Sequence, residues 1–152
     1  MSVERRARCL WSGDLSSGSG TLSTGSGALS DQAVTWASRA EASEGRTSPE
    51  ELIAAAHATC FNMALSLVLK QRGFKAEQVV VDAVCSLELE GAPRISAVDL
   101  RVEGVVPGLD PDSFQSAVSA AADLCPVSNA LRNNVRIGVA AELAERISTR
   151  EV

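Results

Sequence analysis

The sequence predicts a single α+β domain over residues 1–152, with strands and helices segregated in the order β-β-β-α-β-β-α-α-β. Three observations predict this class. Short alternating segments separated by glycines fill the N-terminal quarter, and a long apolar segment follows a clear helix-start signal. Two longer alternating segments then precede two helical patterns and a last strand. A chain of this length can bury a substantial core.

The N-terminal part is predicted to contain three short strands. The candidates are RARCLWSG, GTLST and AVTWASRA, and five glycines between residues 13 and 27 mark the turns. The composition of SSGSGTLSTGSG is also that of a flexible linker. Against that alternative, Thr21, Leu22, Leu29 and Val34 are spaced as hairpin strands require. The segment is not a phosphate-binding loop, because no Gly-Lys-Ser/Thr follows its glycines.

The clearest boundary in the sequence is SPEE, residues 48–51. Ser48 can cap a helix, Pro49 suits the first helical position, and Glu51 completes a capping box. We expect the helix to run from Pro49 to residue 71 or 72, with Gly73 as its terminator. Its interior is apolar on nearly every face, so it cannot lie on the surface of a lone small domain. A partner subunit would enclose it.

The second half predicts two long strands, two helices and a final strand. VVVDAVCSLELE and RISAVDLRVEGVV alternate with a period of two and are joined through a Gly-Ala-Pro turn. A helix is expected from Asp110 through about Asp123, and Cys125 begins a short helical turn that runs through Leu131. VRIGVAAELAE forms the last strand, and the tail after Arg146 is expected to fray.

Composition and charge exclude several functions. The net charge is −5, and only Arg5, Arg6 and Arg8 lie near one another, so no basic stripe is available for nucleic acid. The N-terminus lacks the apolar segment of a signal peptide. The apolar stretch 52–69 carries polar side chains, and a buried helix explains it better than a membrane span. We therefore expect a cytoplasmic protein without nucleic-acid or membrane partners.

The chain has four cysteines, Cys9, Cys60, Cys85 and Cys125, and a single histidine, His57. No two cysteines form a Cys-x-x-Cys pair, so a zinc site is not expected. In a reducing cytosol disulfides tend to be transient and catalytic, which directs attention to reactivity. Cys9 and Cys85 lie in strand patterns without an activating neighbour and are interpreted as structural.

Cys60 and Cys125 each allow two interpretations. Cys60 lies in mid-helix, where a buried apolar thiol is common, and reactivity there needs a cation such as Arg39. Cys125 precedes Pro126, so it either caps a helix that stabilises its thiolate or merely begins one. His57 shares a helix face with Cys60 and permits a Cys–His nucleophile pair for acyl transfer. No oxyanion-hole signature accompanies that pair, and a packed core histidine is the alternative.

Glu50 precedes Cys60 by ten residues, which corresponds to a rise of about 15 Å along one helix. Their side chains cannot meet within the same straight helix. Either an arginine bridges the gap, or Glu50 comes from a second chain whose central helix runs antiparallel to the first. The simpler alternative is a carboxylate that favours the start of a helix.

Two segments closely resemble signatures of the OsmC/Ohr family. TSPEELIAAAHATCFNMAL, residues 47–65, resembles the central-helix signature, and CPVSNAL, residues 125–131, resembles the second signature. The WSGDL and VVPGLD segments also fit the OsmC branch, so the likeness covers essentially the whole chain. The resemblance implies an intertwined homodimer in which curved antiparallel sheets back two long central helices. Its active sites would lie at the subunit interface.

The resemblance also implies the roles of individual residues. Cys60 would be the peroxidatic thiol, Cys125 the resolving thiol, and Glu50 the carboxylate that orients an arginine. In the OsmC branch that arginine lies before the central helix, where Arg39 of SRAE fits. Arg46, in the turn just before the helix, is the competitor. The Ohr branch uses an arginine nearer the N-terminus, where this chain has only Gly, Ser, Leu and Thr.

The resemblance implies an antioxidant peroxidase that reduces alkyl or fatty-acid hydroperoxides to alcohols. Catalysis would pass through a Cys60 sulfenic acid and a Cys60–Cys125 disulfide, which a lipoyl-type dithiol reduces. No bound cofactor or metal is expected. An apolar pocket mouth would favour alkyl hydroperoxides over hydrogen peroxide. Its expected lining is Ile53, Met63, Phe114 and Leu124. The alternative function is a thiol redox sensor or binding protein that oxidises without turnover.

Overall fold

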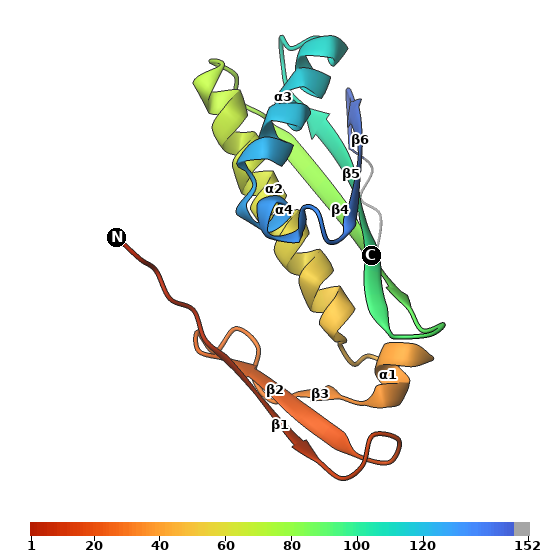
Figure 1. The fold of residues 1–152 in the computed structure, drawn as a ribbon. Coiled ribbons are helices and arrows are strands. Elements are labelled where there is room, and N and C mark those ends of the chain that lie inside the picture. The colour runs from red at the N-terminus through yellow and green to blue at the C-terminus, as the bar shows by residue number, and fades with distance from the viewer. Residues whose placement is uncertain (148–152) are drawn as a thin grey trace. The chain divides into compact units, whose positions relative to one another are not determined.

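The computed structural model describes residues 1–147. This part of the chain forms two compact units, Met1–Leu52 (unit 1) and a second that begins at Ile53 (unit 2) (Figure 1). The single domain expected over residues 1–152 stays a prediction. The tail that was expected to fray lies outside the described residues from position 148 onward. The elements are β1 (Ala7–Ser12), β2 (Ser19–Thr24), β3 (Gln32–Val34), α1 (Trp36–Ala40), α2 (Pro49–Gln71), β4 (Gln78–Glu88), β5 (Arg94–Val105), α3 (Pro111–Leu124), α4 (Pro126–Leu131) and β6 (Arg136–Leu143).

In unit 1, β1, β2 and β3 form an antiparallel sheet in that order (Figure 1). Cys9 is paired with Leu22, and Gly20 is paired with both Trp11 and Val34, so these side chains share one face of the sheet. Gly20 is required there, because a Cβ would come within 2.9 Å of the Trp11 ring and of a Val34 methyl group. The serine- and glycine-rich segment is therefore an ordered part of a sheet and not a linker.

The third predicted strand is only partly a strand. AVTWASRA is extended as far as Val34 and then forms the short helix α1. Thr35 caps this helix: its Oγ accepts a hydrogen bond from the Ser38 amide at 3.0 Å, and the Ser38 Oγ accepts one from the Thr35 amide at 3.1 Å. This is a capping box built with serine in the position where glutamate or glutamine is usual. The observed order therefore contains one helix more than the prediction.

Helix α2 begins and ends as predicted. The Ser48 Oγ accepts a hydrogen bond from the Glu51 amide at 3.1 Å, and Gly73 follows the helix with a φ of 82°. By length and composition alone α2 could cross a membrane. Phe61 and Leu65, however, are fully buried among other side chains of unit 2, so α2 is a core helix of the protein.

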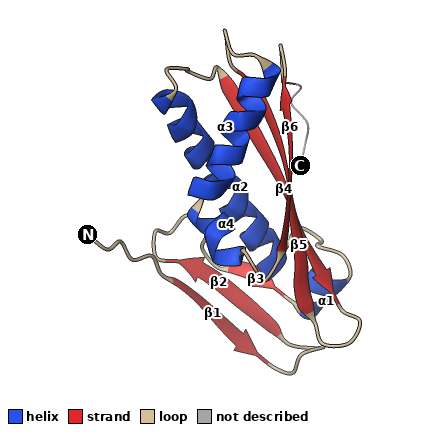
Figure 2. Ribbon diagram, turned by 45° about the horizontal axis from the view of Figure 1, so that its top comes forward, coloured by secondary structure: helices blue, strands red, loops and turns tan. Residues whose placement is uncertain are grey.

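Unit 2 is a three-stranded sheet with α2, α3 and α4 on one face (Figure 2). Its core combines one face of α2 with β5 and the apolar face of α3. The largest contributors are Phe61, Leu65, Leu69, Val98, Leu100, Val102, Phe114 and Val118. The opposite face of α2 is not covered: Met63 is 68% exposed and Leu67 is 48% exposed. A large apolar surface therefore remains on this helix.

The direction of β6 differs from the prediction. β4 and β5 are antiparallel, but β6 pairs with β5 in parallel, from Ala97 opposite Arg136 to Gly104 opposite Leu143. The expectation of purely antiparallel sheets therefore does not hold for unit 2. The cause is the connection, since the chain passes through α3 and α4 before it returns to the sheet, as a parallel neighbour requires.

Candidate functional site

Cys60 and Cys125, which are distant in the sequence, lie together in unit 2. Cys60 is in α2, Cys125 precedes α4, and their side chains are hydrogen-bonded to each other. Both are free thiols; Cys125 is fully buried and Cys60 is half-buried. The structure thus brings the two predicted redox cysteines into contact.

Cys125 is the N-cap of α4, and its Sγ accepts a hydrogen bond from the Ser128 amide at 3.5 Å. Burial raises the pKa of this thiol. Hydrogen bonds from the Ser128 hydroxyl and amide, from Cys60 and from the Val127 amide outweigh that effect, so the pKa of Cys125 lies below its ordinary value. The surroundings of Cys125 therefore favour its thiolate.

The surroundings of Cys60 act in the opposite direction. Burial raises the pKa of the Cys60 thiol, and the hydrogen bond and negative charge of Cys125 raise it further, against a lowering by the Val127 amide. Of the two thiols, Cys125 is therefore the one whose thiolate is favoured, and the Cys60 thiol is its hydrogen-bond donor. A peroxidatic Cys60 needs an additional cation.

His57 is fully buried, and its Nε2 lies 2.8 Å from the Oγ of Ser128. Burial lowers the pKa of the imidazole, so it is neutral near pH 7. Its ring meets Phe61 edge-on, with the ring centres 6.5 Å apart. Within the described residues His57 makes no hydrogen bond to Cys60. This geometry favours a core histidine over the Cys–His nucleophile pair.

Unit 1 contains the predicted arginine and carboxylate as an ion pair. The Nη2 of Arg39 lies 2.7 Å from Oε1 of Glu50, and its Nε lies 3.1 and 3.2 Å from the two carboxylate oxygens. The Glu50 side chain is only 9% exposed. The guanidinium also lies 5.8 Å from the centre of the Trp36 ring. Three hydrogen bonds to Glu50 and an aromatic face therefore fix the orientation of Arg39.

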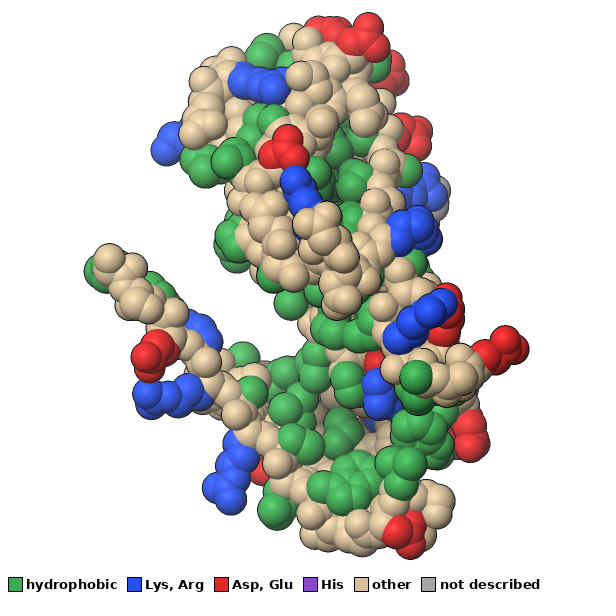
Figure 3. All heavy atoms as spheres, viewed as in Figure 1, with side chains coloured by type: hydrophobic (Ala, Val, Ile, Leu, Met, Phe, Trp, Pro, Cys, Tyr) green, Lys and Arg blue, Asp and Glu red, His purple; other side chains and the backbone are tan. Residues whose placement is uncertain are grey.

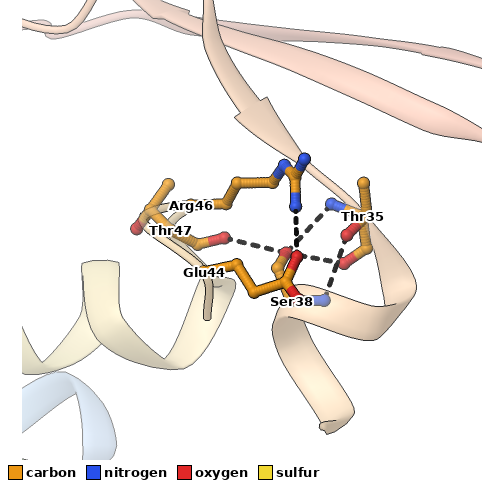
Figure 4. Close-up of polar contacts among 5 residues, drawn as sticks. All are labelled: Thr35, Ser38, Glu44, Arg46 and Thr47. Atoms are coloured by element: carbon orange, nitrogen blue, oxygen red, sulfur yellow. Dashed lines mark hydrogen bonds and ion pairs between the residues drawn. The ribbon is translucent and has the colours of Figure 1, made fainter. Parts of the chain in front are cut away.

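Arg46, the competing arginine, is bound within its own loop. Its Nη1 lies 3.1 Å from Oε2 of Glu44 (Figure 4). The Arg46 side chain is 41% exposed. The Ser38 hydroxyl lies 3.5 Å from the carbonyl oxygen of Thr47 and connects the end of this loop to α1 (Figure 4). Arg46 thus has a local acidic partner in an exposed loop, which favours Arg39 as the functional arginine.

Sequence reasoning missed an apolar groove of about 280 Å³ in unit 1. Figure 3 shows hydrophobic side chains gathered in the lower part of the view, where Figure 1 draws β1–β3. The groove is lined by Trp11, Leu22, Val34, Trp36, Cys9 and Arg39, among others. Cys9 is therefore an exposed side chain on the groove face and not a packed structural thiol. The signal was the alternation of Cys9 with Trp11, which places both on one face of a strand.

The expected pocket mouth is partly wrong. Phe114 is 1% exposed and belongs to the core, where its ring lies against Gly104. Met63 and Leu124 are exposed, at 68% and 49%, and Ile53 is partly buried. Cys85 is half-buried and packs against the core of unit 2, in agreement with a structural role.

Together these features define a small α+β protein with a contacting pair of cysteines and an oriented arginine. Residues 42–140 match the family model of the OsmC-like protein. The chain is 38% identical over 138 residues to peroxiredoxin OsmC of Escherichia coli (strain K12), covering 90% of this chain and 96% of that protein. It therefore belongs to the OsmC-like family, as the sequence signatures predicted.

The Ohr proteins are also similar to this chain. It is 35% identical over 116 residues to the organic hydroperoxide resistance protein OhrA of Bacillus subtilis (strain 168), covering 76% of this chain and 79% of that protein. Among solved structures, the organic hydroperoxide resistance protein OhrB of Bacillus subtilis matches with a TM-score of 0.73 and 29% identity. That match covers 90% of this chain and 98% of OhrB.

Proposed function

We propose that this protein is a cysteine-based peroxidase that reduces organic hydroperoxides to alcohols in defence against oxidative stress. Relatives named peroxiredoxin OsmC and organic hydroperoxide resistance protein support a peroxidase role. The observation that carries the proposal is the contact between Cys60 and Cys125. Turnover through a disulfide requires two thiols within bonding reach.

In the first step the Cys60 thiolate attacks the outer oxygen of the hydroperoxide. A sulfur–oxygen bond forms, the peroxide bond breaks, and Cys60 becomes a sulfenic acid. The alkoxide leaves as an alcohol after it takes up a proton equivalent to the one that the Cys60 thiol released. Cys125 then attacks the Cys60 sulfur, which forms the disulfide and releases water. An external dithiol of the lipoyl type restores both thiols by two exchange reactions, so no bound cofactor is needed.

Arg39 supplies the cation that Cys60 lacks in unit 2. The ion pair with Glu50 holds the guanidinium in one orientation, ready to lower the pKa of a thiol and to polarise a peroxide. Glu50 and Cys60 are ten positions apart along α2, too far for their side chains to meet, which argues that Arg39 of the partner subunit does this in a homodimer. The exposed apolar face of α2, with Met63 and Leu67, supports such a partner.

The groove beside Arg39 supports an organic substrate. Its walls are mostly apolar, and burial of an alkyl chain contributes about 0.8 kcal/mol for each methylene group. Hydrogen peroxide gains nothing from such walls. We place the protein in the cytoplasm, where a reducing environment keeps Cys60 and Cys125 as thiols.

The test is a steady-state assay with cumene hydroperoxide or hydrogen peroxide and dihydrolipoamide as the electron donor. We expect many turnovers per subunit, a preference for the organic substrate, and complete loss of turnover in Cys60→Ser. Cys125→Ser should react once and then over-oxidise when hydroperoxide is in excess. Oxidation of the unaltered protein by a single equivalent without turnover would instead indicate the redox sensor.

A further inference from the structure

The core of unit 2 contains a buried polar pair that the proposed reaction does not use. His57 of α2 is 0% exposed and Ser128 of α4 is 1% exposed, with 2.8 Å between Nε2 and Oγ. Polar side chains are costly to bury unless they are hydrogen-bonded. The pair lies directly beside the cysteines, because Ser128 is also a hydrogen-bond partner of Cys125.

The hydrogen-bond partners of His57 indicate which ring nitrogen carries the proton. The neutral imidazole has one N–H, and Nδ1 has no partner among residues 1–147. Buried N–H groups without an acceptor are rarer than buried acceptors without a donor. The proton therefore belongs on Nε2, where the Ser128 oxygen accepts it.

This tautomer determines the direction of the next hydrogen bond. A Ser128 hydroxyl that accepts from His57 has its own proton available for Cys125. The hydroxyl and the amide of Ser128 both bond to the Cys125 sulfur. A chain of donors thus runs from His57 Nε2–H to Ser128 Oγ–H to Cys125 Sγ. Among the described residues, one more ionisable group joins this series of hydrogen bonds: Cys60, which is bonded to Cys125.

We propose that His57 is a positioning residue for the resolving step: through the Ser128 hydroxyl it holds Cys125 as the thiolate that attacks the Cys60 sulfenic acid. The inference rests on the proposed peroxidase function. In this step the Cys60–Cys125 bond forms and the sulfur–oxygen bond of the sulfenic acid breaks. The leaving hydroxide combines with the proton that Cys125 released earlier, so water is the product. His57 itself does not touch a reacting atom.

The experiment separates the two chemical steps in one sample of the full-length protein. Reduced protein receives one equivalent of cumene hydroperoxide, is quenched with dimedone at intervals, and is analysed by mass spectrometry for sulfenic acid and for disulfide. His57→Leu removes the donor, and Ser128→Ala removes only the hydroxyl. His57→Gln keeps an N–H near the position of Nε2 but does not take up a proton.

We expect His57→Leu and Ser128→Ala each to slow disulfide formation by about tenfold or more, because each removes part of a hydrogen-bond chain to a charged sulfur. Sulfenic acid formation at Cys60 should not slow in the same samples. His57→Gln should keep most of the resolving rate. In the double variant the two losses should not add, since His57 acts through Ser128.

A second readout follows the Cys125 thiolate directly. With Cys9→Ser, Cys60→Ser and Cys85→Ser as the background, Cys125 is the remaining thiol. The ultraviolet absorbance of its thiolate is titrated with and without His57→Leu, and we expect His57→Leu to raise the pKa of Cys125. Unchanged resolving rates in Ser128→Ala would overturn the inference even if His57→Leu did not fold. Additive losses, or a His57→Gln variant as slow as His57→Leu, would also overturn it. If the unaltered protein forms no disulfide, the proposed function fails and the resolving role of His57 fails with it. The Cys125 titration then still tests whether His57 favours the Cys125 thiolate through Ser128.

Discussion

The thiols of Cys60 and Cys125 share one hydrogen bond, in which Cys60 donates and Cys125 accepts. Burial raises the pKa of both thiols, but only Cys125 has enough further donors to bring its pKa below the ordinary value. Unit 2 is therefore prepared for the second step of the proposed reaction, whereas the first step depends on a cation that must reach Cys60.

Loss of the Arg39 guanidinium should slow the attack of Cys60 on the hydroperoxide and leave disulfide formation unchanged. Replacement of Arg39 by alanine should slow sulfenic acid formation by about a hundredfold, the usual cost of removing one charge-stabilising donor from an active site. Lysine should restore only part of the rate, because it cannot make the bidentate contact with Glu50. Stopped-flow reaction with cumene hydroperoxide measures the rate.

Arg46→Ala is the matched control, because Arg46 pairs with Glu44 in an exposed loop. It should react at nearly the normal rate. An equal loss in Arg46→Ala would show that the wrong arginine has been chosen.

The pKa of Cys60 should depend on the residue at position 125. Cys125 raises the pKa of Cys60 through its hydrogen bond and its charge, so Cys125→Ser should lower it. In the reverse variant, Cys60→Ala, the pKa of Cys125 should rise, because Cys60 is one of its donors and alanine has none. The pH dependence of iodoacetamide alkylation, read at each cysteine by peptide mass spectrometry, measures both values. Shifts in the opposite directions would contradict the hydrogen bond as described.

Gly20 should be necessary for the stability of the sheet in unit 1. An added Cβ would lie 2.9 Å from the Trp11 ring, from the Leu10 carbonyl oxygen and from a Val34 methyl group. Gly20→Ala should therefore lower the free energy of unfolding by about 1–3 kcal/mol, the usual cost of overpacking. Urea denaturation measures the change, and Ser19→Ala, at an exposed position of the same strand, is the control. Equal stability of the two variants would mean that the β1 backbone and the Trp11 and Val34 side chains move aside without cost.

The sequence alone was sufficient for elements with strong terminal signals. Ser48 and Gly73 define α2, and both act as predicted because caps depend on a few neighbouring residues. The helix α1 was missed because its Thr35–Ser38 capping box lies inside a segment that otherwise alternates like a strand. The direction of β6 was also missed, since alternation gives the face of a strand but not its direction.

The residues of the site likewise divide into those that the sequence predicted and those that it did not. Proximity of Cys60 and Cys125 followed from the family signatures, because spacing along the chain says nothing about two residues on different helices. The contact between His57 and Ser128 had no signal in the sequence: the partners are 71 residues apart, and each looks like an ordinary helix residue. The Arg39–Glu50 pair was predicted from the family resemblance, and the structure shows the two side chains as an ion pair.

The exposed apolar face of α2 leads to a prediction that connects assembly with activity. Met63 is 68% exposed at the centre of that face, and in the proposed homodimer it is buried against the second subunit. Met63→Lys would place a charge in that interface, so the dimer should dissociate at concentrations where the unaltered protein remains dimeric. Sedimentation velocity measures the change. Leu89→Lys, at an exposed apolar position beyond β4, is the control and should remain dimeric.

Because the proposed active site takes Arg39 of the partner subunit, monomeric Met63→Lys should also lose sulfenic acid formation at Cys60. A monomer with full peroxidase activity would mean that each subunit activates its own Cys60.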